Sequence, residues 1–297
     1  MKILTVTWAH NSEKTIARTI QSILSQSYAD FAYYIIDNAS TDQTRSIIHR
    51  YASSDSRIIP IDNQQNDRWI SFKILPRILG ECGKEDYFCN IDADDEYKPD
   101  FFAKMLKFAQ DNQLDIAACG NDIIDANTGK LLGVRKASSN IIINQEDFDQ
   151  YFQQYYQYIR TVWGKLFSIS ALSQGSFQPD SQMSFYGIDT LFSMEAFRQA
   201  KRIGILAESL HKYYMSPQSV SYHFDTQRFR SDQVLFDRAY QYLIDKCGSA
   251  STQNYCFLLL VYMNAIQDTV RVLLGSKISS TDKLNYLHKI CTDQRTK

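Results

Sequence analysis

Three aspartates stand within four residues, Asp92, Asp94 and Asp95, directly after a short apolar segment. That segment, Tyr87–Ile91, is rich in aromatic residues, which indicates a buried strand. Pro99 then opens a helical pattern, because proline suits the first turn of a helix. Carboxylates at the end of a buried strand can hold a hard divalent cation through oxygen ligands, and Mg²⁺ or Mn²⁺ so bound keeps open positions for the oxygens of a diphosphate. The alternative is a polar loop, since Asp is common in turns.

The elements that must position this cluster alternate between strand and helix. The predicted strands are Ile3–Trp8, Ala32–Ile36, Arg57–Ile61, Tyr87–Ile91 and Asp115–Ile124. The first predicted helix carries Ile16, Ile20, Ile23 and Leu24 on one face. The others run from a capping segment at residues 40–42 to Tyr51, from Trp69 to Leu79 and from Pro99 to Asn112. This order predicts an α/β fold, with a mostly parallel sheet and helices on both of its faces. Because ligands of such sheets bind beyond the carboxyl ends of the strands, we expect Asp37 and Asp92 to lie in one cleft.

The second half of the chain is more helical. We predict helices over Gln145–Ile159 and Ile188–Ala200 and a strand over His211–Met215. From Arg228 the pattern is helical to near the end, with breaks around residues 248–252 and 275–280. We therefore expect an α/β domain over residues 1–227 and a helical C-terminal appendage over residues 228–297.

Composition narrows the class of protein. The chain has 297 residues, of which 44% are hydrophobic and 22% charged, so one large α/β domain with an appendage is a natural expectation. Its formal net charge of −1 argues against a nucleic-acid binder. From Arg198 onward, however, 14 Lys and Arg outnumber 8 Asp and Glu. This basic part could face an anionic membrane surface, although a solvated basic face is the simpler interpretation.

The cysteines and the apolar runs indicate the cellular compartment in which the protein is expected. The six cysteines include no C-x-x-C pair, so neither a disulfide framework nor a zinc site is predicted, and a reducing cytoplasm fits. Met1–His10 has no signal-peptide pattern. The longest apolar run, Cys256–Met263, is too short to span a bilayer. We accordingly expect a cytoplasmic protein.

Four segments carry a family resemblance. They are Ile3–Asn11, Ser22–Tyr28, Tyr34–Thr44 and the aspartate cluster. In this order they closely resemble the inverting family 2 glycosyltransferases of the GT-A fold, well to about residue 110 and more loosely to about Phe224. The resemblance implies a Rossmann-like, mostly parallel sheet flanked by helices. It also implies metal-dependent transfer of a sugar from a nucleotide-sugar donor, most often UDP-linked, to an acceptor hydroxyl.

The resemblance implies a nucleoside site at the end of the second predicted strand. Asp37 and Asn38 would hydrogen-bond the uracil edge and the ribose, although the family more often has Asp at position 38. His10 stands where the family usually has an aromatic residue that packs on the base. The alternative for residues 37–42 is a helix-capping turn, in which we expect Ser40 or Thr41 to make the cap. For His10 the alternative is simple packing in the loop.

The resemblance also implies a metal site and a catalytic base. Asp94 would contact the ribose or the metal, Asp95 would ligate the metal directly and Asp92 would support them, with Mn²⁺ or Mg²⁺ as the cofactor. The family commonly carries Glu-Asp at the start of a helix on the acceptor side. Here Ile188 replaces the Glu, and Asp189 keeps the position of the base that deprotonates the acceptor. The alternative for Asp189 is a carboxylate that merely favours a helix N-terminus.

The setting implied by the resemblance is assembly of a bacterial surface polysaccharide. The acceptor would be a glycan or a lipid-linked glycan, and residues 228–297 would dock peripherally at the inner membrane face, bind a partner or pack on the domain. Two rival hypotheses stay open. One is a non-catalytic nucleotide-sugar-binding relative. The other is a haloacid-dehalogenase-like Mg²⁺-dependent phosphatase, which also begins with Asp-x-Asp after a strand but places it after the first strand of its core.

Overall fold

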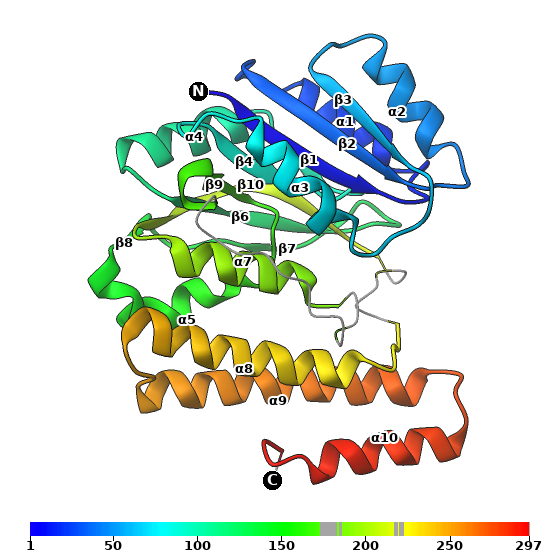
Figure 1. The fold of residues 1–297 in the computed structure, drawn as a ribbon, viewed down its shortest axis with the longest axis vertical. Helices are drawn as coiled ribbons and strands as arrows, with labels where there is room; N and C mark the ends of the chain where they lie inside the picture. The colour runs from blue at the N-terminus through cyan, green and yellow to red at the C-terminus, as the bar shows by residue number, and fades with distance from the viewer. Residues whose placement is uncertain (173–182, 184–185, 217–218, 220–222, 297) are drawn as a thin grey trace. The chain divides into compact units, whose positions relative to one another are not determined.

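A computed structural model describes residues 1–172, 183, 186–216, 219 and 223–296 of the chain. By their contacts these residues form two compact units, which we describe one at a time (Figure 1). The first unit comprises residues within 1–145, 161–178 and 195–216. The second comprises residues within 146–160, 179–194 and 217–297.

The first unit is built on one ten-stranded sheet. Its strands are β1 (Ile3–Ala9), β2 (Phe31–Asn38), β3 (Ile58–Asn63), β4 (Tyr87–Asn90), β5 (Glu96–Tyr97), β6 (Ile116–Asp125), β7 (Leu131–Arg135), β8 (Ile141–Ile143), β9 (Lys165–Ser168) and β10 (Ile203–Met215). The main order is β3-β2-β1-β4-β9-β6-β10-β5, with β7 beside β6 and β8 beside β10. Strands β3, β2, β1 and β4 are parallel neighbours, and β9 enters antiparallel between β4 and β6.

Helices lie on both faces of this sheet (Figure 1). They are α1 (Ile16–Leu24), α2 (Thr44–Ala52), α3 (Ile70–Gly80), α4 (Phe101–Asp111) and the short α6 (Ile169–Leu172). Helix α1 shows why such segments fold: Ile16, Ile20 and Ile23 recur at helical spacing and are fully buried in the core beneath the parallel strands. The predicted α/β fold is thus confirmed.

The start of α2 differs from the prediction. Neither Ser40 nor Thr41 caps this helix, because both hydroxyls bond to Asn11 in the loop after β1. The Asp42 carboxylate instead accepts the Thr44 N–H at 2.9 Å. The loops that follow β1 and β2 are therefore tied to each other at the carboxyl edge of the sheet.

The second unit is helical. It contains α5 (Phe148–Ile159), the first part of α7 (Ile188–Gln199), α8 (Arg228–Cys247), α9 (Thr252–Gly275) and α10 (Ser280–Thr292). The predicted breaks are present: Gly248 ends α8 with φ of 76°, and Ser251 and Ser279 cap the two following helices. Of the described helices, α9 is long and apolar enough to cross a membrane by length and composition, and 28% of its apolar window is buried. The predicted domain boundary after residue 227 stays a prediction.

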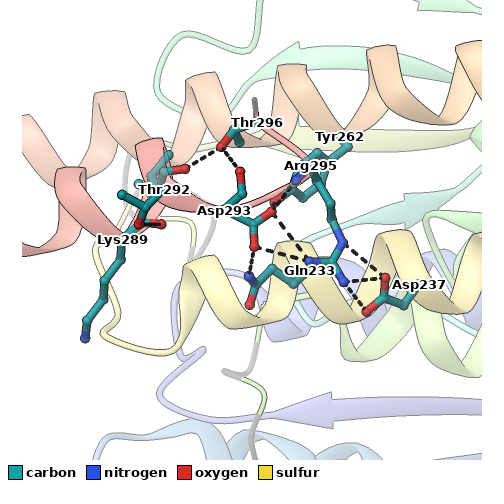
Figure 2. A network of polar contacts seen from close by, with 9 residues as sticks. Gln233, Asp237, Tyr262, Lys289, Thr292, Asp293, Arg295 and Thr296 are labelled. Carbon is teal, nitrogen blue, oxygen red and sulfur yellow. Dashed lines mark hydrogen bonds and ion pairs between the residues drawn. The ribbon is translucent and has the colours of Figure 1, made fainter.

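A polar network fastens the segment after α10 to α8 (Figure 2). Arg295 binds both carboxylate oxygens of Asp237 at 2.8 Å and also contacts Asp293. Gln233 on α8 donates to Asp293 at 2.7 Å. These bonds tie the chain just after α10 to one face of α8.

Candidate functional site

The aspartate cluster lies just beyond the carboxyl end of β4. One carboxylate oxygen from each of Asp92, Asp94 and Asp95 falls within 4.8 Å of the other two. Asp95 is buried, with 1% of its surface exposed, while the other two reach solvent. The structure thus brings together the three residues predicted to hold a metal.

Helix α1 fixes the backbone of this loop. Thr15, Arg18 and Thr19 donate to the carbonyl oxygens of residues 93, 94 and 95 at 2.9, 2.5 and 2.8 Å, respectively. Their spacing of three and four residues places all three side chains on one face at the start of the helix. Because α1 satisfies the loop carbonyls, the carboxylates are not needed to hold the turn together.

Strand β10 holds the Asp95 carboxylate from the other side. The Tyr214 N–H donates to Oδ1 at 2.8 Å, and Nε2 of His211 lies 3.0 Å from Oδ2. The register of β10 shifts on either side of Ser209, and such a bulge re-aims the side chains that follow it. His211 is fully buried, stacked on Trp163 at 4.4 Å between ring centroids and edge-on to Tyr97 at 5.4 Å.

Burial controls the protonation of this pair. It lowers the pKa of the His211 imidazole to about 3, so the ring is neutral near pH 7. Burial, together with the neighbouring Asp94 charge, raises the pKa of the Asp95 carboxyl well above its usual range. Partial removal from water raises the pKa of the Asp94 carboxyl as well. Two adjacent carboxyls of raised pKa would both be stabilised in their charged form by a cation.

The donor set fits a hard divalent cation. It consists of carboxylate oxygens, which Mg²⁺ and Mn²⁺ prefer. Asp95 Oδ2 is buried and accepts no hydrogen bond of good geometry from any residue within the described ranges. Glu96 is committed elsewhere, because it binds Arg18 at 3.2 Å, Lys212 at 3.1 Å and the Tyr214 hydroxyl. The residues that would hold a metal are therefore Asp92, Asp94 and Asp95, as predicted.

The predicted nucleoside residues lie at the carboxyl ends of β1 and β2. Asp37 is 1% exposed and pairs in register with Ala9 of β1 and Asp62 of β3. Its two carboxylate oxygens each lie 3.4 Å from the Ser40 N–H, a long and weak hydrogen bond. Asp37 thus keeps acceptor capacity, as expected from the sequence.

Asn38 and His10 organise the loop after β3. The Asn38 side chain accepts from Asn63 at 2.9 Å and from the Asp67 N–H at 3.0 Å, and it donates to Asn66 and to the Asp67 carbonyl, both at 3.0 Å. Nδ1 of His10 lies 2.9 Å from the Asn38 carbonyl, and its Nε2 lies 3.1 Å from the Asn66 amide. Residues 63–69 and Lys73 line a pocket of about 720 Å³. The polar groups of Asn38 are therefore engaged in shaping this pocket wall.

Asp189 lies in the second unit, in the first turn of α7. The helix begins at Ile188, as predicted, and its first hydrogen bond joins the Leu191 N–H to the Gly187 carbonyl at 3.1 Å. The Thr190 hydroxyl donates to the Arg160 carbonyl at 3.1 Å. The role of Asp189 as a base stays a prediction.

His211 is the residue of this site to which the sequence pattern assigns no role. Its signal is a titratable side chain inside an apolar strand, followed three residues later by Tyr214. A single histidine has no spacing partner, so the pattern cannot separate a support for a carboxylate from an ordinary core residue.

Known proteins resemble this chain in sequence and in fold. A sequence model of the family described as glycosyl transferase family 2 matches residues 5–174. The uncharacterized glycosyltransferase EpsJ of Bacillus subtilis is 26% identical over 214 residues, which are 71% of this chain and 60% of that protein. TuaG of the same organism, a putative teichuronic acid biosynthesis glycosyltransferase, is 29% identical over 121 residues, or 40% of this chain and 46% of that protein. The chain therefore spans less than two thirds of the length of these relatives.

Two solved structures share the fold. The structure of S. aureus TarS 1-349 in complex with UDP has a TM-score of 0.66 at 15% identity, and the match covers 98% of this chain and 79% of that one. The mannosyltransferase PcManGT from Pyrobaculum calidifontis, in complex with GDP-Man and Mn²⁺, has a TM-score of 0.55 at 15% identity, covering 99% and 81%. These likenesses confirm the predicted GT-A type of sheet flanked by helices, with helices at the C-terminal end.

Proposed function

The chain belongs to glycosyl transferase family 2, and we propose that it transfers a sugar from a UDP-sugar to an acceptor hydroxyl with inversion, using Mn²⁺ or Mg²⁺. The observation that carries the proposal is the cluster of Asp92, Asp94 and Asp95 beyond β4, inside the region matched by the family. The similarly folded TarS structure with UDP supports this choice of donor, and the PcManGT structure with Mn²⁺ supports the choice of cofactor.

Each candidate site residue of the first unit would have a task in this reaction. Asp92, Asp94 and Asp95 would hold the cation, which when bound neutralises charge on the departing diphosphate. Asp94 would also contact the ribose. Asp37 would accept a hydrogen bond from the base, since its oxygens are only weakly engaged. Asn38, with His10, would act on the base through the pocket wall that the two residues shape.

Transfer also needs a proton acceptor at the attacking hydroxyl. Asp189 would take this proton, which leaves the acceptor oxygen free to attack the sugar carbon opposite the diphosphate. A single displacement of this kind inverts the anomeric centre. The position of Asp189 in the first turn of α7 supports this role, because it matches the position of the carboxylate base in the family that the sequence resembles.

The proposed setting is assembly of a cell-surface polysaccharide in the cytoplasm, on a glycan or lipid-linked acceptor. The relative TuaG, whose name refers to teichuronic acid biosynthesis, supports this setting. Peripheral attachment to the inner membrane face is part of the proposal. It is supported by the apolar length of α9 and by its exposed Leu260 and Leu274.

Thermal unfolding with nucleotides tests the proposal directly. The full chain is heated with UDP, GDP, dTDP or CDP, each with Mn²⁺ and with EDTA. We expect a rise in Tm with UDP that EDTA abolishes, because a ligand that binds only the folded state stabilises it. A rise in Tm with GDP alone would mean that the donor carries GDP in place of UDP. No rise with any nucleotide would overturn the proposal.

A further inference from the structure

The turn that leads into α7 is pressed against α8. Gly187 has φ of 92°, a conformation that side chains rarely adopt, and a Cβ added there would lie 2.8 Å from Leu235 of α8. The left-handed φ therefore favours glycine in this turn, which lies beside α8. Asp189 follows two residues later, so its position depends on how this turn is held.

A buried polar chain holds the residue before that glycine. The Arg228 guanidinium lies over the Tyr186 ring, 4.2 Å from its centroid, and its Nε donates to the Thr269 hydroxyl at 3.0 Å. Thr269 in turn donates to Asp232 at 2.6 Å. We call Tyr186, Arg228, Asp232 and Thr269 the Arg228 network. It joins α8 and α9 to the turn that precedes Asp189.

Stability alone is a poor reason for this network. Arg228 and Asp232 are each 2% exposed, and Thr269 is 1% exposed. Removing such charges from water is costly, and apolar residues of similar volume often stabilise a protein as well or better. A hydrogen-bonded network of this kind fixes one arrangement of its side chains, whereas an apolar contact would tolerate several arrangements.

Two further bonds complete the support on the other side of the turn. The Thr190 hydroxyl is anchored to the Arg160 carbonyl, and the Leu191 N–H closes the first helical bond on Gly187. Asp189 is thus bracketed by anchored residues on both sides. A shift of the Tyr186 ring would therefore also move the backbone of Asp189.

We propose that the Arg228 network positions Asp189 for proton transfer, so that helices α8 and α9 serve the chemistry as well as the packing of the second unit. The inference rests on the proposed role of Asp189 as the base. Arg228 is on this view a positioning residue, because it acts through Tyr186 and the turn.

Hydrogen–deuterium exchange of the full chain tests the positioning step. The variant Arg228→Met removes the charge but keeps the length of the side chain. Arg295→Met is the matched control, since Arg295 also makes an ion pair within the helical unit, binding Asp237 of α8 from the segment after α10 (Figure 2). We expect amides 188–194 to exchange at least about tenfold faster in Arg228→Met and at the wild-type rate in the control. Equal rates in all three proteins, or equal acceleration in both variants, would overturn the inference.

A second variant covers the case in which Arg228→Met does not fold. Tyr186→Leu removes the ring but leaves the hydrogen bonds among Arg228, Thr269 and Asp232 in place. It should accelerate exchange over the same amides, and Tyr186→Phe, which keeps the ring, should not. Wild-type exchange in Tyr186→Leu would contradict the proposal.

Turnover distinguishes this inference from the proposed function. Release of UDP from UDP-N-acetylglucosamine and from UDP-glucose is followed with Mn²⁺. We expect Arg228→Met to lower kcat about ten- to a hundredfold with little change in KM, since a misplacement of about 1 Å can cost that much. Arg228→Lys, which keeps a cation over the ring, should restore most of the loss.

The outcomes separate cleanly. If Asp189→Asn abolishes turnover but Arg228→Met keeps the wild-type kcat, the positioning role is wrong and the proposed function stands. If Asp189→Asn keeps full turnover, the base role is wrong, and exchange over residues 188–194 still decides whether Arg228 holds the turn.

Discussion

Replacing His211 by phenylalanine tests how the Asp95 carboxylate is held. One carboxylate oxygen is fixed by the Tyr214 N–H at 2.8 Å, and the other faces the imidazole at 3.0 Å. Phenylalanine fills the same place in the aromatic stack but offers no polar atom, so the carboxylate can rotate away from the cation. Loss of a group that orients a metal ligand typically weakens metal binding about ten- to a hundredfold. This corresponds to about 1.4 to 2.8 kcal/mol.

The same change should not destabilise the metal-free protein. Nδ1 of His211 is buried and makes no hydrogen bond of good geometry within the described part of the chain. A buried polar atom without a hydrogen bond costs about 1 to 3 kcal/mol, and phenylalanine removes that cost. The stacking on Trp163 and Tyr97 remains available to the new ring. We therefore expect the Tm in EDTA to stay the same or to rise.

The assay is a titration of Mn²⁺ in the presence of UDP, read as Tm, with EDTA as the baseline. His49→Phe is a matched control, because His49 also lies against a carboxylate of the first unit, Asp62, at 2.8 Å. The control should bind Mn²⁺ like the wild type. The reasoning would be refuted if His211→Phe bound Mn²⁺ with wild-type affinity. It would also be refuted if the variant unfolded at a lower temperature in EDTA.

Asp95→Asn should abolish the Mn²⁺-dependent rise in Tm with UDP while raising the Tm in EDTA, because the raised pKa shows that its charge is costly without a cation; an unchanged rise would contradict this. Asn38→Ala should lower UDP affinity, measured by calorimetry, since it removes four hydrogen bonds that shape the loop after β3; wild-type affinity would mean that the loop does not serve the nucleotide. Burial raises the pKa of Asp232 to about 6, from an ordinary value of 3.8. The protonated Asp232 carboxyl therefore contributes fully to the free energy of unfolding below pH 4, and this contribution, at most about 3 kcal/mol, is lost as the pH rises through 6. Asp232→Asn should remove this loss of stability between pH 4.5 and 7.5, measured by denaturant titrations at both pH values. Asp189→Asn should abolish transfer and leave UDP affinity within about twofold of wild type. A loss of UDP affinity with retained transfer would contradict the role of Asp189 as the base.

The parallel half of the sheet was predictable because each strand is an apolar run with a helix on either side. The predicted strand Ile3–Trp8 is observed as Ile3–Ala9, and the helix predicted from Pro99 to Asn112 is observed as Phe101–Asp111. Their periods of two and 3.6 are set by local sequence, which is what a pattern can detect. The helices of the second unit were predictable for the same reason.

Strands β9 and β10 were less predictable from the same signals. Strand β9 (Lys165–Ser168) has four residues and carries a buried lysine, whose ammonium is satisfied by Thr161 and the Trp163 carbonyl. Strand β10 begins eight residues before the predicted start at His211, because Gly204, Ala207 and a bulge interrupt its apolar alternation. Such strands form because distant partners bind them, and a local pattern does not report distant partners.

In the candidate site, too, some residues were predictable from local sequence and others depend on distant partners. The three aspartates were predictable, since carboxylates at the end of a strand suit a cation wherever the rest of the fold lies. The role of Asn38 in shaping the loop after β3 was not, because it depends on Asn63 and Asp67, which lie on another strand end and loop. His211 was missed because its meaning comes entirely from Asp95, far away in sequence.

The surroundings of Asp95 bear on the order of events during folding. Its carbonyl is bound by Thr19, 76 residues earlier, and its carboxylate by Tyr214, 119 residues later. Contacts that close such long loops form late, since the chain entropy they cost is recovered only when the sheet is nearly complete. A partly folded chain would therefore lack the cradle around these carboxylates. A divalent cation would then bind the native protein, in which the sheet is complete, and would not bind an earlier folding intermediate.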